Sequence, residues 1–201
     1  MNIDIWHMDA PVHHASRFFA QSILAQTLNL PVRAIEFARG EFGKPYLPSF
    51  PQCAFNLSHS RDKMVMAVGF HLRLGIDIEA INEHRRFERL VKKCFSPAEQ
   101  AYWHTQPLTQ QIRLFYEFWT RKEALVKGVG RGIAMGLAQC EMDITCHDKF
   151  VALPHDENAM NWHTHLLTTQ SNDYCTAIAV NAHSVTFHHK NWADYFPSPS
   201  T

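Results

Sequence analysis

The order of hydrophobic patterns along this 201-residue chain is the feature that most constrains its fold. Three strand-like runs follow one another in the first half, at Ala54–Leu57, Met64–Phe70 and Leu74–Ile78. A mainly helical stretch from His84 to Lys127 comes next, and strand-like runs return from Ala138 onward. Strands that are grouped apart from helices are typical of an α+β fold. We therefore predict an α+β protein with two lobes.

The remaining elements follow from the same periodicities. A short alternating strand is expected at Met1–Met8, and a helix is expected at His13–Leu30, which Pro31 ends. The helical stretch should contain three helices, the second capped by Ser96, at His84–Cys94, Pro97–Trp103 and Gln110–Lys127. Later strands are expected at Gln139–Thr145, Met160–Thr168 and Asp173–Val180, followed by a loose tail at Pro197–Thr201.

The boundary between the lobes should fall near Ile78–Asn82, which gives an N-terminal lobe at 1–78 and a C-terminal lobe at 79–201. No low-complexity linker marks this boundary. We therefore expect the lobes to pack closely, and the cleft between them is a natural place for a site.

Composition excludes several classes of function. Basic and acidic residues balance at 19 each, so no overall field favours nucleic acid or a membrane surface. The first ten residues do not resemble a signal peptide, and no run approaches the ~20 apolar residues of a spanning helix. The five cysteines form no CxxC pair, which is typical of reduced thiols in a cytoplasmic protein. The histidines lack metal-ligand spacing, and we expect them to be scattered over strands and surface.

The segment Gly75–Glu79 places two acidic residues two apart in a predicted strand. Side chains at that spacing point to the same face, so Asp77 and Glu79 should project together while Ile76 and Ile78 face the core. Two neighbouring carboxylates repel each other unless a cation screens them, and Mg²⁺ prefers such hard oxygen ligands. An ordinary edge strand with a wet acidic face is the alternative.

The segment Trp119–Lys127 places Glu123 and Lys127 four residues apart on one helix face. A surface ion pair would explain that spacing equally well. However, the surrounding aromatic residues indicate a largely buried helix, and a glycine-rich turn at Gly128–Gly132 would let a ligand approach the backbone. These features favour a functional interpretation without settling it.

The segment Phe55–Ser60 is an apolar strand that ends in hydroxyl and imidazole groups. A nucleophilic Ser58 with His59 as its base is geometrically poor, because neighbours on a strand point to opposite faces. A solvent-exposed polar strand end and a set of phosphate ligands both remain open, with Lys44 and Arg17 as further cationic candidates. No P-loop is present, which argues against a nucleoside triphosphatase.

Together, these motifs resemble those of the 4′-phosphopantetheinyl transferases of the large, surfactin-synthetase-activating type. Gly43–Pro45, Phe55–Ser60, Gly75–Glu79 and Trp119–Lys127 occur in the family's order. The resemblance implies two pseudo-symmetric α+β lobes, each a small, mostly antiparallel sheet packed on helices. It also implies a monomer that binds coenzyme A in the cleft between the lobes.

The activity implied is transfer of the 4′-phosphopantetheine group from coenzyme A to a serine of an apo acyl or peptidyl carrier protein, with release of 3′,5′-ADP. Such an enzyme is a transferase of the holo-(acyl-carrier-protein) synthase type. Two alternatives stay open: a non-catalytic module that binds carrier proteins, and another Mg²⁺-dependent enzyme acting on phosphate esters or pyrophosphate.

The resemblance also implies roles for individual residues. Mg²⁺, or Mn²⁺ in its place, would be held by Asp77, Glu79 and Glu123. Glu123, Lys127 and Asp77 would be the catalytic residues, with Glu123 taking the serine proton. Coenzyme A would be bound by Arg17, Lys44, Pro45, Ser58, His59 and Lys127.

The chain departs from the family pattern in its short front end, which lacks the usual basic stretch, so we expect either weaker coenzyme A affinity or substitution by His13 or His14. Arg61 follows the Phe55–Ser60 motif where a small residue is common, and we expect it to face solvent. Glu99 is a further candidate for the rim of the metal site. Finally, Arg85, Arg89 and Lys92 or Lys93 recur at helical spacing, which suits either a docking face for an acidic carrier or a solvated helix face.

Overall fold

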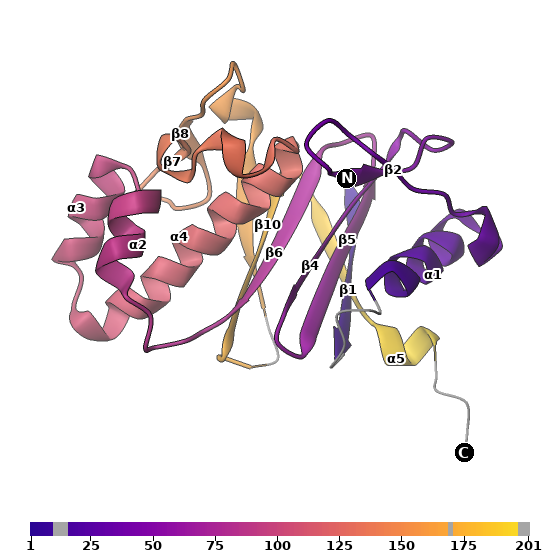
Figure 1. Ribbon diagram of the computed structural model, residues 1–201, viewed down its shortest axis with the longest axis horizontal. Coiled ribbons are helices and arrows are strands. Elements are labelled where there is room, and N and C mark those ends of the chain that lie inside the picture. Colours follow the sequence, from indigo (N-terminus) through magenta and orange to yellow (C-terminus); the bar gives the residue numbers. More distant parts are fainter. Residues whose placement is uncertain (10–15, 169–170, 197–201) are drawn as a thin grey trace.

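The computed structural model describes residues 1–9, 16–168 and 171–196. Within these residues the chain forms a four-stranded sheet, a three-stranded sheet and two short ribbons of two strands each. Figure 1 shows helices α2, α3 and α4 on one flank of the two sheets and helices α1 and α5 on the other flank. This arrangement confirms the predicted α+β class.

The four-stranded sheet has the strand order β11-β1-β5-β4. Its antiparallel strands are β1 (Asn2–Asp9), β5 (Lys63–Phe70) and β4 (Cys53–Ser60), and β11 (Thr186–Asn191) runs parallel to β1. Its helices are α1 (Ser16–Leu28) and α5 (Trp192–Tyr195), and a ribbon of β2 (Ala38–Arg39) and β3 (Pro45–Tyr46) lies between α1 and β4 in the sequence.

The three-stranded sheet has the antiparallel order β6-β10-β9. Its strands are β6 (Leu74–Ala80), β10 (Tyr174–Val180) and β9 (His163–Leu167), and its helices are α2 (Phe87–Cys94), α3 (Pro97–Thr105) and α4 (Leu108–Val129). The second ribbon pairs β7 (Glu141–Met142) with β8 (Phe150–Ala152). Single 3₁₀ turns occur at Val32–Ala34, Gly132–Met135, Leu137–Gln139 and Ala159–Asn161.

Three buried clusters hold these layers together. The first lies under α1 against β1, β4 and β5, and the second lies between α2–α4 and the outer face of β10. The third cluster joins the inner faces of the two sheets, with Ile3 and Ile5 of β1 and Ile76, Ile78 and Ile178 of the second sheet. The core is therefore continuous across both lobes, which fixes how one sheet lies against the other.

Strands β4 and β6 lie side by side where the two sheets meet (Figure 1), and side chains of β4 bridge them. The Ile76 backbone N–H donates to Asn56 Oδ1 at 2.8 Å, and the Ala80 backbone N–H donates to Ser60 Oγ at 2.9 Å. A buried backbone N–H without a partner would destabilise the fold. Asn56 and Ser60 supply the acceptors for two such donors of β6. The alternating polar residues of Phe55–Ser60 therefore join β4 to β6 along the line where the two sheets meet, which we call the seam.

The strand pairing differs from a division of the chain at residue 78. Strand β6 belongs wholly to the sheet with β10, and β11 returns to the first sheet beside β1. The predicted strand at Gln139–Thr145 was too long, because Asp143 Oδ1 accepts hydrogen bonds from the backbone N–H and the hydroxyl of Thr145 and turns the chain. Strand β11 was not predicted, and the tail at Pro197–Thr201 lies outside the described residues.

Helix α4 crosses β6 at a very short distance through Gly75 and Gly128. A Cβ atom added to Gly75 would lie 2.2 Å from both the Ala124 carbonyl oxygen and the Gly128 nitrogen. A Cβ atom added to Gly128 would lie 2.8 Å from the Trp162 ring. The helix and the strand are therefore in backbone contact at this crossing, and only glycine fits at either position.

We expect Gly75→Ala to destabilise the fold by about 3 kcal/mol or more, because the added methyl group meets rigid backbone atoms and not a movable side chain. Urea unfolding followed by circular dichroism measures this change. Gly40→Ala is the matched control, since the nearest atom to its added Cβ is 3.7 Å away. Equal stability of the two variants would contradict the close crossing.

Candidate active site

The polar face of β6 is directed at α4. Gly75, Asp77 and Glu79 alternate with the core residues Ile76 and Ile78, as the strand periodicity predicts. Their partners across the ladder on β10 are the small residues Ala179, Ala177 and Cys175. Small neighbours and the glycine crossing let α4 come close, so residues of α4 meet the carboxylates of β6 directly.

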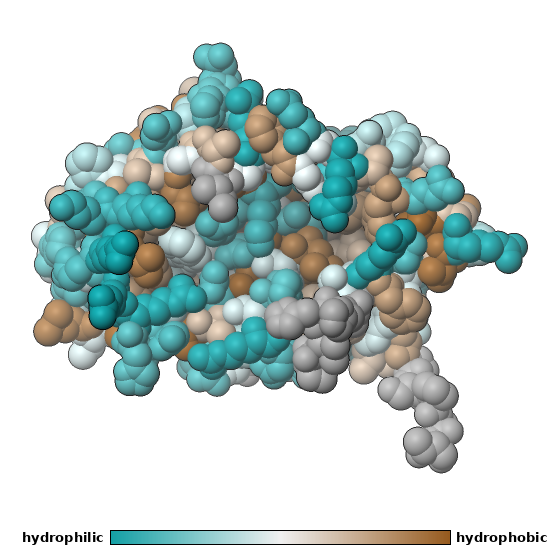
Figure 2. All heavy atoms as spheres, viewed as in Figure 1, coloured by the Kyte–Doolittle hydropathy of each residue, from teal (hydrophilic) through white to brown (hydrophobic). Residues whose placement is uncertain are grey.

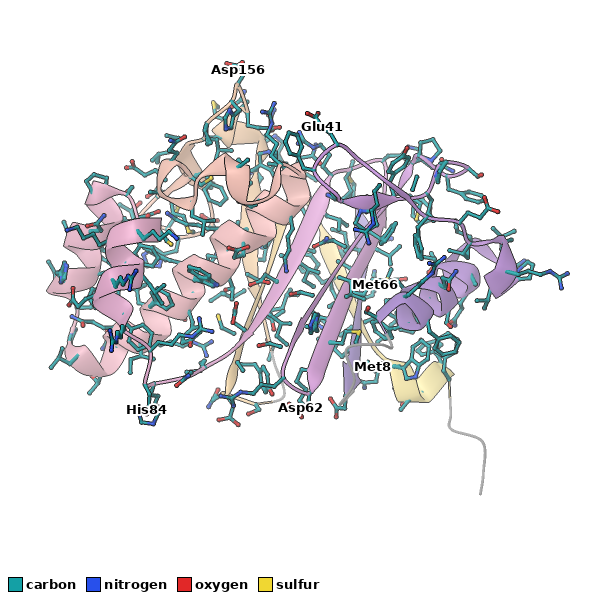
Figure 3. The ribbon with its side chains drawn as sticks, in the orientation of Figure 1. Met8, Glu41, Asp62, Met66, His84 and Asp156 are labelled. Carbon is teal, nitrogen blue, oxygen red and sulfur yellow. The ribbon has the colours of Figure 1, made fainter. Side chains whose placement is uncertain are left out.

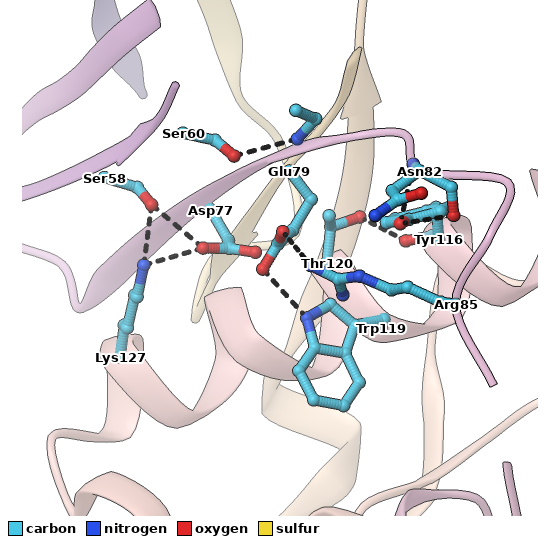
Figure 4. A network of polar contacts seen from close by, with 11 residues as sticks. Ser58, Ser60, Asp77, Glu79, Asn82, Arg85, Tyr116, Trp119, Thr120 and Lys127 are labelled. Carbon is cyan, nitrogen blue, oxygen red and sulfur yellow. Dashed lines mark hydrogen bonds and ion pairs between the residues drawn. The ribbon is translucent and has the colours of Figure 1, made fainter. Parts of the chain in front are cut away.

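Ser58, Asp77 and Lys127 form a mutually bonded triad at this meeting point (Figure 4). Lys127 Nζ donates to Asp77 Oδ1 at 2.7 Å and to Ser58 Oγ at 2.8 Å, and Ser58 Oγ donates to Asp77 Oδ1 at 2.9 Å. Asp77 is only 4% exposed, and its second oxygen, Oδ2, is buried without a hydrogen-bond partner. A buried carboxylate oxygen left open in this way can accept a ligand.

Glu79 is held by two further residues. Trp119 Nε1 donates to Glu79 Oε1 at 3.1 Å, and the Arg85 guanidinium lies 3.5 Å from Glu79 Oε2 (Figure 4). Burial and the neighbouring Asp77 carboxylate raise the pKa of Glu79, while Trp119 and Arg85 oppose that rise. The sequence did not indicate either contact, because both partners lie far away along the chain or on a loop.

Glu123 is half-buried on the α4 face that looks toward β6. Burial raises its pKa to about 7, the charge of Asp77 adds to the effect, and the Lys127 ammonium opposes it. A carboxylate with a pKa near neutrality can exchange a proton at physiological pH. The structure thus brings together Ser58, Asp77, Glu79, Glu123 and Lys127, all of which the sequence proposed.

The described residues contain no group of three His, Cys, Asp or Glu side chains that could together hold a metal ion. Two features of the carboxylates nevertheless fit a divalent cation: the open Oδ2 of Asp77, and the mutual repulsion that raises the pKa of Glu79 and Glu123. Asp77, Glu79 and Glu123 therefore stay the predicted ligands.

Lys44 occupies a place that its motif did not predict. Its Nζ donates to the backbone carbonyls of Leu74 at 3.0 Å and Gly128 at 2.8 Å, so it ties the β2–β3 ribbon to both β6 and the end of α4. Burial, with the charge of Arg73, lowers its pKa to about 8. Lys44 thus reinforces the crossing at Gly128, while its role in binding coenzyme A stays a prediction.

The other predicted contact residues are more dispersed. His59 is exposed at the end of β4, Pro45 is half-buried in β3, and Arg17 is exposed on α1, which lies on the flank opposite α4 (Figure 1). Arg61 is exposed in the β4–β5 turn, as expected. His13 and His14 lie outside the described residues.

Glu99 was wrongly assigned to the rim of the metal site. It is fully buried at the start of α3, where its carboxylate pairs with Lys122, accepts from the Met142 backbone N–H at 2.7 Å and completes a capping box with Ser96. A buried ion pair is stable only when additional hydrogen bonds satisfy both charged groups. The Glu99–Lys122 pair has such bonds and anchors α3 to α4.

The face drawn in Figure 2 is hollowed in its middle, between the flank of α2–α4 and the flank of α1, and both hydrophilic and hydrophobic residues reach the hollow. In Figure 3, Glu41 and Asp156 mark one end of the molecule, and Asp62 and His84 mark the other. The β4–β5 turn, which contains Asp62, and the loop into α2, which contains His84, therefore lie along the same edge of the molecule. No described helix is both long enough and apolar enough to cross a membrane.

The sequence profile of the 4′-phosphopantetheinyl transferase superfamily matches residues 73–179, and the profile of the N-terminal region of such transferases matches residues 5–71. The chain belongs to the 4′-phosphopantetheinyl transferase superfamily. The two matches are separated only by residue 72, which lies between β5 and β6. The match over residues 73–179 contains the carboxylates of β6 and all of α4.

Several relatives within the superfamily are similar to this chain. The 4′-phosphopantetheinyl transferase HetI of Nostoc sp. is 34% identical over 134 residues, which is 65% of this chain and 56% of HetI. The 4′-phosphopantetheinyl transferase of Bacillus subtilis is 35% identical over 113 residues, 56% of this chain and 49% of that protein. AcpT of Salmonella typhimurium is 32% identical, over 66% of this chain and 73% of AcpT.

The chain spans about half the length of the first two relatives. Among solved structures, it is similar to a holo-(acyl-carrier-protein) synthase from Bacillus anthracis, with a TM-score of 0.40 and 18% identity, over 54% of this chain and 93% of that one.

We expect Glu123→Gln to stabilise the metal-free protein at pH 8 by about 1–3 kcal/mol and to change it little at pH 5. The folded-state pKa of about 7 lies above the ordinary value of 4.5, so stability is lost as pH rises through this interval and Glu123 ionises. Thermal unfolding in EDTA at both pH values measures the difference. Glu36→Gln, at an exposed position outside the helices and strands, is the control and should show no such pH dependence.

Proposed function

We propose that this chain transfers 4′-phosphopantetheine from coenzyme A to a serine hydroxyl of an apo carrier protein and releases 3′,5′-ADP. Its membership of the superfamily supports the reaction class. The observation that carries the proposal is that Glu79, Glu123 and Lys127, from one strand and one helix, all interact with the charge of Asp77, whose Oδ2 has no hydrogen-bond partner.

The chemistry follows from these groups. Glu123 is suited to accept the proton of the carrier serine, directly or through a water, because it shares one face of α4 with Lys127 and lies within electrostatic reach of Asp77. The serine oxygen then bonds to the phosphorus on the pantetheine side of the pyrophosphate, and the bond from that phosphorus to the bridging oxygen breaks. Lys127 can donate to a phosphate oxygen, since its Nζ already lies among anionic oxygen acceptors.

Ser58 orients both Asp77 and Lys127 through the triad, and we propose that it acts by positioning them. Asp77, Glu79 and Glu123 would hold Mg²⁺ or Mn²⁺. When bound, such a cation neutralises the negative charge that gathers on the leaving phosphate.

We also propose that the protein acts as a cytoplasmic monomer that binds neither nucleic acid nor membrane. The balance of acidic and basic residues supports the absence of nucleic-acid and membrane partners. Coenzyme A would lie over the seam, with Lys44, Pro45, His59 and Arg17 as the proposed further contacts.

The proposed function predicts a coenzyme A-dependent mass gain on one member of a panel of apo acyl and peptidyl carrier proteins, read by intact-protein mass spectrometry with Mg²⁺. Glu123→Gln should lower kcat by about 10²-fold or more, because the base and a ligand are both altered. Binding to carriers without any mass gain would favour a non-catalytic module. Hydrolysis of coenzyme A or of pyrophosphate without transfer would favour another Mg²⁺-dependent phosphate enzyme.

The basic face of α2 is the proposed docking surface for the carrier. Arg89, Lys92 and Lys93 are exposed on it, whereas Arg85 is engaged with Glu79 and does not belong to the free face. A groove beside this face has Phe87, Trp103 and Ile112 among its lining residues, and Leu108 at its edge is 81% exposed.

We expect Arg89→Glu combined with Lys93→Glu to raise KM for the carrier by about tenfold and to leave the Kd of coenzyme A unchanged, because reversed charge repels an acidic partner. Steady-state kinetics and calorimetry measure the two constants separately. Charge reversal at Arg33, exposed in the 3₁₀ turn after α1 on the flank opposite α2, is the control. Unchanged carrier kinetics would remove the docking surface.

A further inference from the structure

We infer that Arg85 is a resident counter-ion of Glu79, which occupies the carboxylate when no divalent cation is bound and must give it up when one enters. The inference rests on the proposed metal site and goes beyond it, because it assigns a role to a residue outside the motifs. Arg85 precedes α2 and is a positioning residue in this scheme.

The two carboxylates of β6 differ in how they are occupied. Asp77 receives both Ser58 and Lys127 on Oδ1, which leaves Oδ2 open. Glu79 has a partner on each oxygen, with Trp119 on Oε1 and Arg85 on Oε2. At Asp77, a cation would therefore find an oxygen with no hydrogen-bond partner to displace, whereas at Glu79 it meets a positive charge 3.5 Å from Oε2.

Arg85 also contacts the Tyr116 ring, so its guanidinium keeps one partner when it moves away from Glu79. Its guanidinium lies 5.4 Å from the centre of the Tyr116 ring, and the Tyr116 hydroxyl accepts a hydrogen bond from the Asn82 backbone N–H at 2.9 Å. The ring thus ties the loop before α2 to α4 independently of Glu79 (Figure 4). Both partners of the Arg85–Glu79 pair are partly exposed, with side-chain exposures of 34% and 22%, and such pairs are weak.

Charge balance explains why a counter-ion is needed. Asp77, Glu79 and Glu123 lie within mutual electrostatic reach, and Lys127 contacts only Asp77 among them. Without a cation and without Arg85, Glu79 would carry a half-buried charge beside Asp77, with the Trp119 indole as its direct partner. Arg85 supplies that missing charge, and a divalent cation would supply it instead when bound.

The test is Mn²⁺ binding to the complete protein without coenzyme A, read from the free Mn²⁺ signal by electron paramagnetic resonance. Arg85→Gln should tighten Mn²⁺ binding about three- to tenfold, because the competing charge is removed while Tyr116 still ties the loop. Arg85→Lys keeps the charge and should stay within about twofold of the wild type. Arg86→Gln, at the neighbouring exposed arginine, is the matched control and should leave the affinity unchanged.

Asp77→Asn separates this inference from the metal site on which it rests. Loss of Mn²⁺ binding in Asp77→Asn identifies the site, and Arg85→Gln is then compared with Arg86→Gln at that site. Unchanged or weaker binding in Arg85→Gln would overturn the counter-ion role while leaving the metal site intact. Equal Mn²⁺ binding by Asp77→Asn and the wild type would refute the metal site and this inference together.

Discussion

The backbone contact between Gly75 and Gly128 is the constraint on which the rest of this structure depends. It brings α4 against β6 with no side chain between them, so the next residues along each element face each other across a very short gap. Asp77 follows Gly75 by two residues, and Lys127 immediately precedes Gly128. A wider crossing would leave room for water between these side chains and would weaken their mutual electrostatic effects.

A second constraint is that polar side chains, and not a backbone ladder, join β4 to β6. Asn56 and Ser60 accept hydrogen bonds from backbone donors of β6, and Ser58 between them donates to Asp77. Residues on one face of β4 therefore both join it to β6 and orient the carboxylate of Asp77. The same alternation explains why Ser58 is buried while its neighbour His59 is exposed.

Local periodicity was sufficient to predict most helices and strands and the pairing of Asp77 and Glu79 on one face. It also placed Glu123 and Lys127 together, because residues four apart share a helix face. It failed where the partner lies far away in the sequence. Lys44 contacts the carbonyls of Leu74 and Gly128, and Glu99 pairs with Lys122. Strand β11 likewise joins β1. In each case the neighbouring residues in the sequence do not indicate the partner. The family resemblance supplied chemical roles that spacing alone left open.

The parallel pairing of β11 with β1 has a consequence for how the chain is made. Thr186 lies opposite Asn2 and Asn191 opposite His7, so during translation β1 waits for β11, which follows α4 and the whole second sheet in the sequence. Until then, one edge of β1 has unpaired backbone groups, and such edges recruit foreign strands. The first sheet would therefore be vulnerable to aggregation throughout translation of the lobe that carries α4, and a chaperone that shields β1 would be of most use during that interval.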